Sequence, residues 1–148
     1  MTVDRATHFG RCHCGNLEVA FETALPPGRV SVRRCTCSFC LSHAALSISD
    51  PEGHIRFTVQ DPARLSRYRF GLKTADFLVC RDCGVYMGAI LDEAGARYAI
   101  VNLNVLDARD AFTGEPVPMS YDSEDVAGRR ARRTEKWSPA TEEIGERV

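Results

Sequence analysis

Cys35, Cys37 and Cys40 stand within one short stretch of the chain. Thiols this close in sequence can converge on one metal ion without help from distant segments, and thiolate sulfur is a ligand that zinc prefers. The other cysteines also fall into tight groups, so none of the seven stands alone. These groups are Cys12 with Cys14, and Cys80 with Cys83. The pattern therefore predicts zinc binding as the chemistry of this protein.

The seven thiols divide most simply into a set of four and a set of three, because a tetrahedral zinc ion takes four ligands. A site of four cysteines is closed and structural, whereas three protein ligands leave one position for water or substrate. Cysteines that are close in sequence converge most easily, which favours a set of three from one stretch: Cys35, Cys37 and Cys40. The set of four then joins two distant stretches: Cys12, Cys14, Cys80 and Cys83. A second division remains open, with a ribbon-type site made of Cys37, Cys40, Cys80 and Cys83.

The open site predicts thiol chemistry rather than hydrolysis. Zinc with three thiolates carries a formal negative charge, which makes it a poor Lewis acid toward water. Such a centre suits a thiol as fourth ligand, held deprotonated and ready to attack a carbonyl carbon. Arg33, Arg34 and Arg81 flank the clusters and are candidates to bind the carboxylates of a small acidic thiol, although solvated arginines are the plainer interpretation. His43 is a candidate proton shuttle or spare ligand, or else an ordinary surface histidine.

Length and composition indicate one globular domain, with 148 residues, 44% hydrophobic and 26% charged. The net charge of −1 gives no electrostatic reason to expect a nucleic-acid or membrane partner. No apolar run approaches the roughly 18 residues of a membrane span, and Asp4, Arg5 and His8 stand where a signal peptide would be apolar. We therefore expect a soluble, cytoplasmic protein whose clustered cysteines bind metal, rather than a secreted disulfide scaffold.

Alternation of apolar and polar side chains, the pattern of half-buried strands, recurs along the chain. It predicts a mainly β domain of roughly eight strands, over residues 16–23, 30–34, 44–49, 55–59, 65–70, 74–79, 85–91 and 97–103. We expect a single helical turn over residues 106–112 and an irregular segment over residues 115–122. Ser123 is the predicted cap of a short helix that ends near Lys136, and the residues after Trp137 are expected to be frayed.

The cysteine groups and their neighbours form three motifs: Gly10-Arg11-Cys12-His13-Cys14-Gly15, Cys35-Thr36-Cys37-Ser38-Phe39-Cys40, and Cys80-Arg81-Asp82-Cys83-Gly84-Val85-Tyr86-Met87. In this order the motifs resemble the glutathione-dependent formaldehyde-activating enzyme family, which also includes centromere protein V. The resemblance covers roughly residues 10–106. It suggests a zinc-binding domain over residues 10–112, with residues 1–9 as a lead and residues 113–148 as a C-terminal extension that packs on it or trails from it.

This resemblance implies a single-domain β-tent of mostly antiparallel strands with two zinc ions per chain, the second site being open to partial occupancy. By the family's pattern the structural zinc is held by Cys12, Cys14, Cys80 and Cys83, and the second, catalytic zinc by Cys35, Cys37 and Cys40. The implied reaction is the addition of glutathione to formaldehyde, giving S-hydroxymethylglutathione. This reaction is classed, in its reverse sense, as that of a carbon–sulfur lyase.

Two other functions compete with this interpretation. One is a zinc-stabilised binding module without turnover, in which both metals only hold the fold. Its basic run at residues 129–133 could contact nucleic acid or an acidic protein, but acidic neighbours such as Glu124 and Asp125 favour a solvated helix face. The other is a methionine sulfoxide reductase of the B type, which needs a free cysteine late in the chain, and none follows Cys83.

Overall fold

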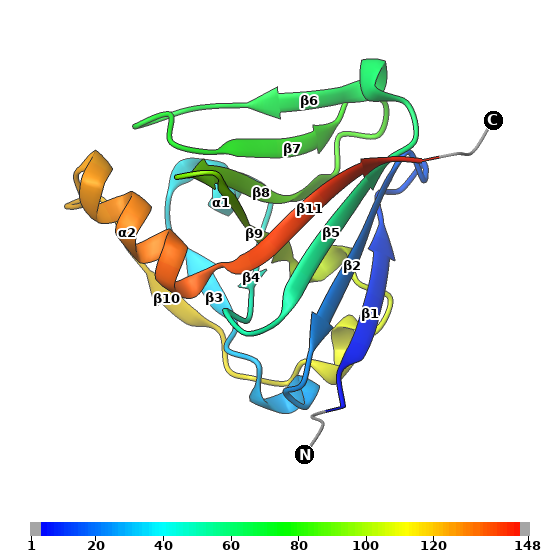
Figure 1. Cartoon of the computed structure of the whole chain (residues 1–148), viewed down its shortest axis with the longest axis horizontal. Helices are drawn as coiled ribbons and strands as arrows, with labels where there is room; N and C mark the ends of the chain where they lie inside the picture. The colour runs from blue at the N-terminus through cyan, green and yellow to red at the C-terminus, as the bar shows by residue number, and fades with distance from the viewer. Residues whose placement is uncertain (1–3, 146–148) are drawn as a thin grey trace.

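One open sheet of eleven strands forms the framework of the chain, of which the computed structural model describes residues 4–145 (Figure 1). Most neighbouring strands are antiparallel, whereas β5 with β11 and β3 with β10 are parallel. The mainly β class predicted from alternation is therefore confirmed, as is the mostly antiparallel pairing that the family resemblance implies. The strands are β1 (Ala6–Arg11), β2 (Leu17–Thr23), β3 (Arg33–Cys35), β4 (Ser47–Ile48), β5 (His54–Val59), β6 (Leu65–Tyr68), β7 (Asp76–Cys80), β8 (Tyr86–Glu93), β9 (Ala96–Asn102), β10 (Val117–Met119) and β11 (Ser138–Ile144).

Strand β11 joins the two halves of the sheet. Its first residues, Ser138 and Pro139, pair antiparallel with β9, and residues 140–144 then pair parallel with β5. In Figure 1 it runs diagonally between these two strands. The expectation that the residues after Trp137 are frayed is therefore wrong for residues 138–144, while residues 146–148 lie outside the described part. The segment is polar and contains a proline, so only its pairing with both halves makes it a strand.

Two more strands were absent from the sequence prediction. Strand β1 pairs with β2, but most of its residues are exposed, so it lacks the alternation that marks a half-buried strand. Strand β10 lies in the segment predicted to be irregular, where Pro118 argued against a strand. It lies at the edge of the strand order beside β3, and an edge position tolerates a proline because no further strand needs its missing N–H group.

Helices are few and short, as predicted. Helix α1 (Ser38–Ser42) follows Cys37, and helix α2 (Val126–Lys136) corresponds to the predicted C-terminal helix. The N-terminal cap of α2 is Asp125 rather than the predicted Ser123, since the Asp125 carboxylate accepts a 2.7 Å hydrogen bond from the Gly128 N–H group. No helix within residues 4–145 is long and apolar enough to cross a bilayer. Four single-turn 3-10 helices complete the described secondary structure: Pro27–Arg29, Pro62–Arg64, Leu103–Val105 and Arg109–Ala111.

Two apolar clusters make up the core. The larger one packs β2, β5, β8 and β9 around Phe21, Phe57 and Met87. The smaller one surrounds Tyr86 and Trp137 and also contains Cys40. Trp137 connects α2 to β11, so burial of its ring holds the C-terminal helix against the sheet.

Ser138 anchors β11 through a pair of buried hydrogen bonds. Its hydroxyl accepts from the Asp50 N–H group and donates to the Asp50 carbonyl, both at 2.8 Å. We expect Ser138→Ala to lower the free energy of unfolding by about 1–3 kcal/mol, because the Asp50 N–H group is left unpaired in a buried place. The Asp50 carbonyl still accepts from the Gly53 N–H group at 2.9 Å. Urea unfolding measures this change. Ser123→Ala, at an exposed position, is the control and should change it by less than about 0.5 kcal/mol. Equal stability of the two variants would refute the anchoring role.

Candidate metal centre and cavity

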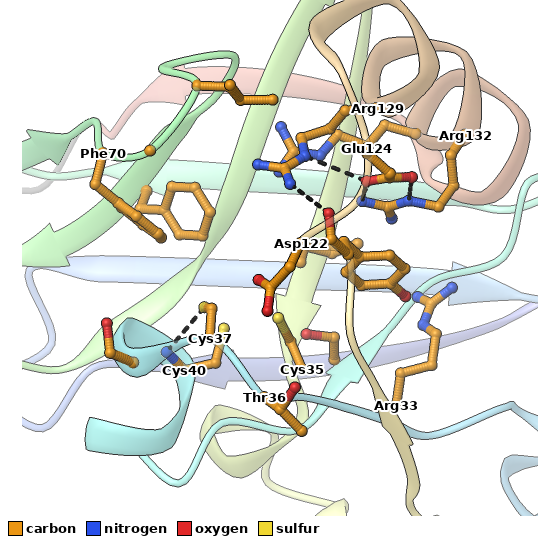
Figure 2. A pocket seen from close by; sticks show the side chains of 18 of the residues that line it. Arg33, Cys35, Thr36, Cys37, Cys40, Phe70, Asp122, Glu124, Arg129 and Arg132 are labelled. Atoms are coloured by element: carbon orange, nitrogen blue, oxygen red, sulfur yellow. Dashed lines mark hydrogen bonds and ion pairs between the residues drawn. The ribbon is translucent and has the colours of Figure 1, made fainter.

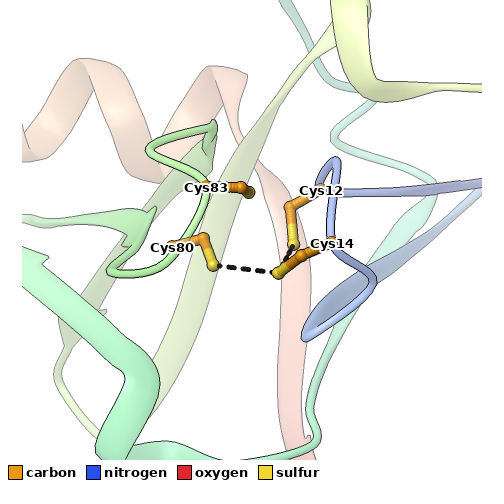
Figure 3. Close-up of side chains that lie close together, drawn as sticks. All are labelled: Cys12, Cys14, Cys80 and Cys83. Carbon is orange, nitrogen blue, oxygen red and sulfur yellow. Dashed lines mark hydrogen bonds between the residues drawn. The ribbon is translucent and has the colours of Figure 1, made fainter.

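Two turns far apart in the chain bring four cysteines together, here named the four-cysteine cluster: Cys12, Cys14, Cys80 and Cys83 (Figure 3). Cys12 and Cys14 belong to the turn between β1 and β2, and Cys80 ends β7. Each turn closes with a glycine in the left-handed region, Gly15 at φ 87° and Gly84 at φ 77°. A side chain at these backbone angles is strained, so glycine lets each turn fold back tightly enough to present two sulfurs on one side.

The sulfur atoms of this cluster lie at contact distance without any covalent bond. Cys12 Sγ is 3.7 Å from Cys14 Sγ, which is 3.5 Å from Cys80 Sγ. All four sulfurs lie within 4.8 Å of one another, and all seven cysteines of the chain are free thiols. The Leu17 N–H group donates to Cys12 Sγ at 3.3 Å. The cluster therefore presents convergent donors with the spacing of a metal site rather than a disulfide.

The second group, here named the three-cysteine cluster, is local. Cys35 ends β3, Cys37 caps helix α1, and Cys40 lies buried within that helix. The Cys37 sulfur accepts a 3.4 Å bond from the Cys40 N–H group, which fixes the turn that brings the sulfurs together. These three sulfurs also lie within 4.8 Å of one another. The division favoured by locality is thus the one found among the described residues, and the ribbon-type alternative that joins Cys37 and Cys40 to Cys80 and Cys83 is not formed.

Strand β10 holds the three-cysteine cluster in place from outside. Met119 pairs with Cys35, and its carbonyl accepts from both the N–H group and the hydroxyl of Thr36, each at 2.9 Å. The loop between the first two cysteines is therefore fixed to a strand more than eighty residues later in the chain.

Hydrogen bonds and burial separate the pKa values of the thiols. The hydrogen bond between Cys35 and Cys40 lowers the pKa of Cys35 to about 5 and raises that of Cys40. Burial raises the pKa of Cys12 to about 12. At Cys83, burial alone would raise the pKa, but hydrogen bonds from backbone N–H groups and neighbouring thiols lower it to about 6. Each cluster therefore holds a thiolate near neutral pH, which is the form that binds metal ions.

A cavity of about 470 Å³ opens beside the three-cysteine cluster (Figure 2). Cys35, Cys37 and Cys40 all line it, whereas no member of the four-cysteine cluster does. Its volume suits a small organic molecule. The three-cysteine cluster is therefore accessible to a ligand in this cavity, whereas the four-cysteine cluster lies outside it.

Opposite walls of the cavity differ in character. Aromatic and aliphatic side chains, including Phe70, Leu72 and Phe77, line one part. In Figure 2, Phe70 lies across the cavity from Arg129 and Arg132. Phe70 also stacks on Phe39 of α1, with ring centroids 5.0 Å apart, so this apolar wall is continuous with the helix that carries Cys40.

The cationic wall comes mostly from helix α2, which corrects the expectation of a solvated basic face. Arg129, Arg132 and Arg133 line the cavity, and Arg133 is only 7% exposed. Glu124 binds two of them, accepting from Arg132 Nε at 2.7 Å and from Arg129 Nε at 3.2 Å. The Arg132 hydrogen bond is the main cause of a lowered pKa at Glu124. The spacing of these arginines, three and four residues apart, was the one sequence signal that they share a helix face.

The arginines and the histidine singled out in the sequence analysis differ in whether they lie at the cavity. Arg33 lines the cavity and donates to Ser49 Oγ at 2.6 Å. Arg34 and Arg81 are exposed and lie outside the cavity lining. His43 ends helix α1 and packs against Phe39, with ring centroids 4.6 Å apart, so it lies beside the three-cysteine cluster without being one of the grouped ligands.

Comparisons with known proteins identify the family of this chain. Residues 7–119 match the family model described as glutathione-dependent formaldehyde-activating enzyme. A Rhodobacter sphaeroides protein of known crystal structure, a structural genomics target, has 33% sequence identity to this chain. The two structures match with a TM-score of 0.54, over 74% of this chain and 97% of that chain. No curated protein matches significantly. The resemblance predicted from the cysteine motifs is confirmed, and the chain belongs to the glutathione-dependent formaldehyde-activating enzyme family.

Proposed function

We propose that this chain is an enzyme that adds a small thiol, glutathione or a similar molecule, to an aldehyde such as formaldehyde. In the reverse sense the reaction is that of a carbon–sulfur lyase. The observation that carries the proposal is the three-cysteine cluster at the side of a cavity of about 470 Å³, while the other four cysteines form a separate cluster. Family membership supports the same reaction. A cytoplasmic location belongs to this proposal, because free thiols persist in a reducing compartment.

Zinc fits the donors of both clusters. Bonds of about 2.3 Å from a tetrahedral zinc ion place its sulfur ligands roughly 3.8 Å apart, and the separations in the four-cysteine cluster are 3.7 and 3.5 Å. We assign the structural zinc to the four-cysteine cluster and the second zinc to the three-cysteine cluster. In this proposal the structural zinc holds the sheet as the β-tent that the family resemblance implies.

The proposed reaction joins sulfur to carbon without oxidation or reduction. The carbon–sulfur bond forms as the carbonyl double bond opens, and the proton lost by the thiol ends on the carbonyl oxygen. A zinc ion held by Cys35, Cys37 and Cys40 would supply a soft Lewis acid that favours the deprotonated form of a fourth thiol near neutral pH. Phe70 and Phe77 give the cavity an apolar surface, while the arginines of α2 offer hydrogen-bond donors.

Metal content separates the two proposed roles. We expect Cys83→Ser to leave mostly insoluble protein, because loss of the closed site removes folding free energy. Cys40→Ser should fold, retain one zinc ion per chain instead of two, and lose thiol binding. Elemental analysis of the purified proteins and circular dichroism test this prediction. If Cys40→Ser unfolded the chain as completely as Cys83→Ser, the distinction between a structural and a catalytic zinc would be wrong.

Turnover is best measured as exchange, because thiols and formaldehyde also combine without an enzyme and the mixture reaches the same equilibrium with or without the protein. We expect the zinc-loaded protein to accelerate exchange between ¹³C-formaldehyde and its glutathione adduct at least tenfold in two-dimensional exchange NMR. With Cys40→Ser at the same protein concentration, the exchange rate should equal the rate without enzyme. Zinc-loaded protein that binds glutathione but does not accelerate exchange would instead be a zinc-stabilised binding module.

A further inference from the structure

Two guanidinium groups of the cavity have no carboxylate partner. Arg33, Arg129, Arg132 and Arg133 line the cavity together with Asp122 and Glu124, so four guanidinium groups face two carboxylates before the thiolate of the three-cysteine cluster is counted. Glu124 neutralises part of the charge of Arg129 and Arg132. Within residues 4–145, neither Arg33 nor Arg133 forms an ion pair with a carboxylate.

Arg133 is the more deeply buried of these two arginines. It is 7% exposed, donates to Thr74 Oγ1 at 2.6 Å, and lies over the Trp137 ring at 4.8 Å. Its Nε atom has no hydrogen-bond partner among the described residues. A hydroxyl and an aromatic face stabilise a cation less than a carboxylate does, so Arg133 is held in the cavity wall with its charge uncompensated.

Arg33 reaches the same cavity from strand β3. Its partner is the Ser49 hydroxyl, which itself donates to the Lys136 carbonyl at 2.8 Å, so the guanidinium is held by neutral groups. Ser49 therefore ties β3 to the end of helix α2, next to Trp137. Two arginines from separate elements thus leave uncompensated charge on one small cavity.

We propose that Arg133 and Arg33 form an anion subsite that binds a carboxylate of the thiol substrate, an inference that rests on the proposed function. An uncompensated buried cation is costly, and a bound carboxylate offsets that cost with charge-assisted hydrogen bonds. Because the same cavity also contains the three-cysteine cluster, a small thiol with a carboxylate at its far end is able to reach both. The subsite then selects carboxylated thiols over neutral ones.

Helix α2 contributes Arg133 to this subsite from beyond the region that matches the family, whereas Arg33 lies inside that region. The family match ends at residue 119, whereas Arg133 and Trp137 follow it. The cysteines that would hold the second zinc lie inside the match. We therefore assign the chemistry to the matched region and thiol selectivity, in large part, to the helix beyond it.

Trp137 provides a direct test, since it is the single tryptophan and lines the cavity. Zinc-loaded protein is titrated with glutathione and with glutathione diethyl ester, in which both carboxylates are neutral, by tryptophan fluorescence and by calorimetry. We expect wild type to bind glutathione more tightly than the ester. Arg133→Gln should weaken glutathione binding roughly ten- to a hundredfold, the loss expected for a hydrogen bond between charged groups, and leave ester binding nearly unchanged.

Arg130→Gln is the matched control, because Arg130 belongs to the same helix, lies outside the cavity lining and pairs with Glu93. It should bind both thiols as wild type does. Arg33→Gln provides the same test should Arg133→Gln fail to fold. Inorganic phosphate is titrated in parallel, and phosphate that competes as well as glutathione would overturn the preference for a carboxylate.

Two further results would contradict the proposal of an anion subsite. Equal loss of affinity for glutathione and its ester would mean that Arg133 only supports the fold. Loss of the second zinc in Arg133→Gln, without selective loss of glutathione, would mean that the arginine only balances the charge of the three-cysteine cluster. Failure of the proposed function gives a different pattern, in which carboxylate-dependent binding persists while the exchange rate stays at its spontaneous value.

Discussion

The four-cysteine cluster forms only if two turns that are distant in the sequence lie side by side, and the strands on either side of these turns are positioned accordingly. Cys14 and Cys80 are 66 residues apart in the chain, yet their Sγ atoms are 3.5 Å apart. The contact joins the turn after β1 to the turn before β8, so strands from the beginning and the middle of the chain are held together. Thiols without a metal have little tendency to approach one another in this way, whereas metal binding converts the approach into folding free energy. The proposed structural zinc would therefore act as part of the core.

The three-cysteine cluster depends on a different kind of support. Its sulfurs come from one short stretch, so local structure alone brings them together. What the rest of the fold contributes is access and position: Met119 of β10 holds the loop at Thr36, and α2 with the loop around Phe70 forms the walls of the cavity. A cluster that is formed locally remains open on one side, and this is the physical difference between the two groups of cysteines.

Charge in the cavity follows from the same arrangement. Glu124 lies just before α2 and binds two arginines of that helix, which keeps the wall ordered. Arg133 is instead fixed by Thr74, which lies just before β7, and by Trp137 at the end of α2. The helix is thus attached to the core by the side chains that also give the cavity its positive charge. Residues beyond the region matched by the family complete the site that the family motifs begin.

The cysteine motifs determined, by themselves, which residues could act as ligands, because ligand type and close spacing are local properties of a chain. Alternation likewise predicted the mainly β class, since strands such as β2 and β5 each have one buried face. Tertiary structure decided between the two divisions of the cysteines by bringing Cys12 and Cys14 to Cys80 and Cys83. It alone decided that polar segments such as β10 and β11 are strands, and that Arg133 is buried rather than solvated. Each of these outcomes depends on a partner far away in the sequence, and a local pattern carries no information about which partner that is.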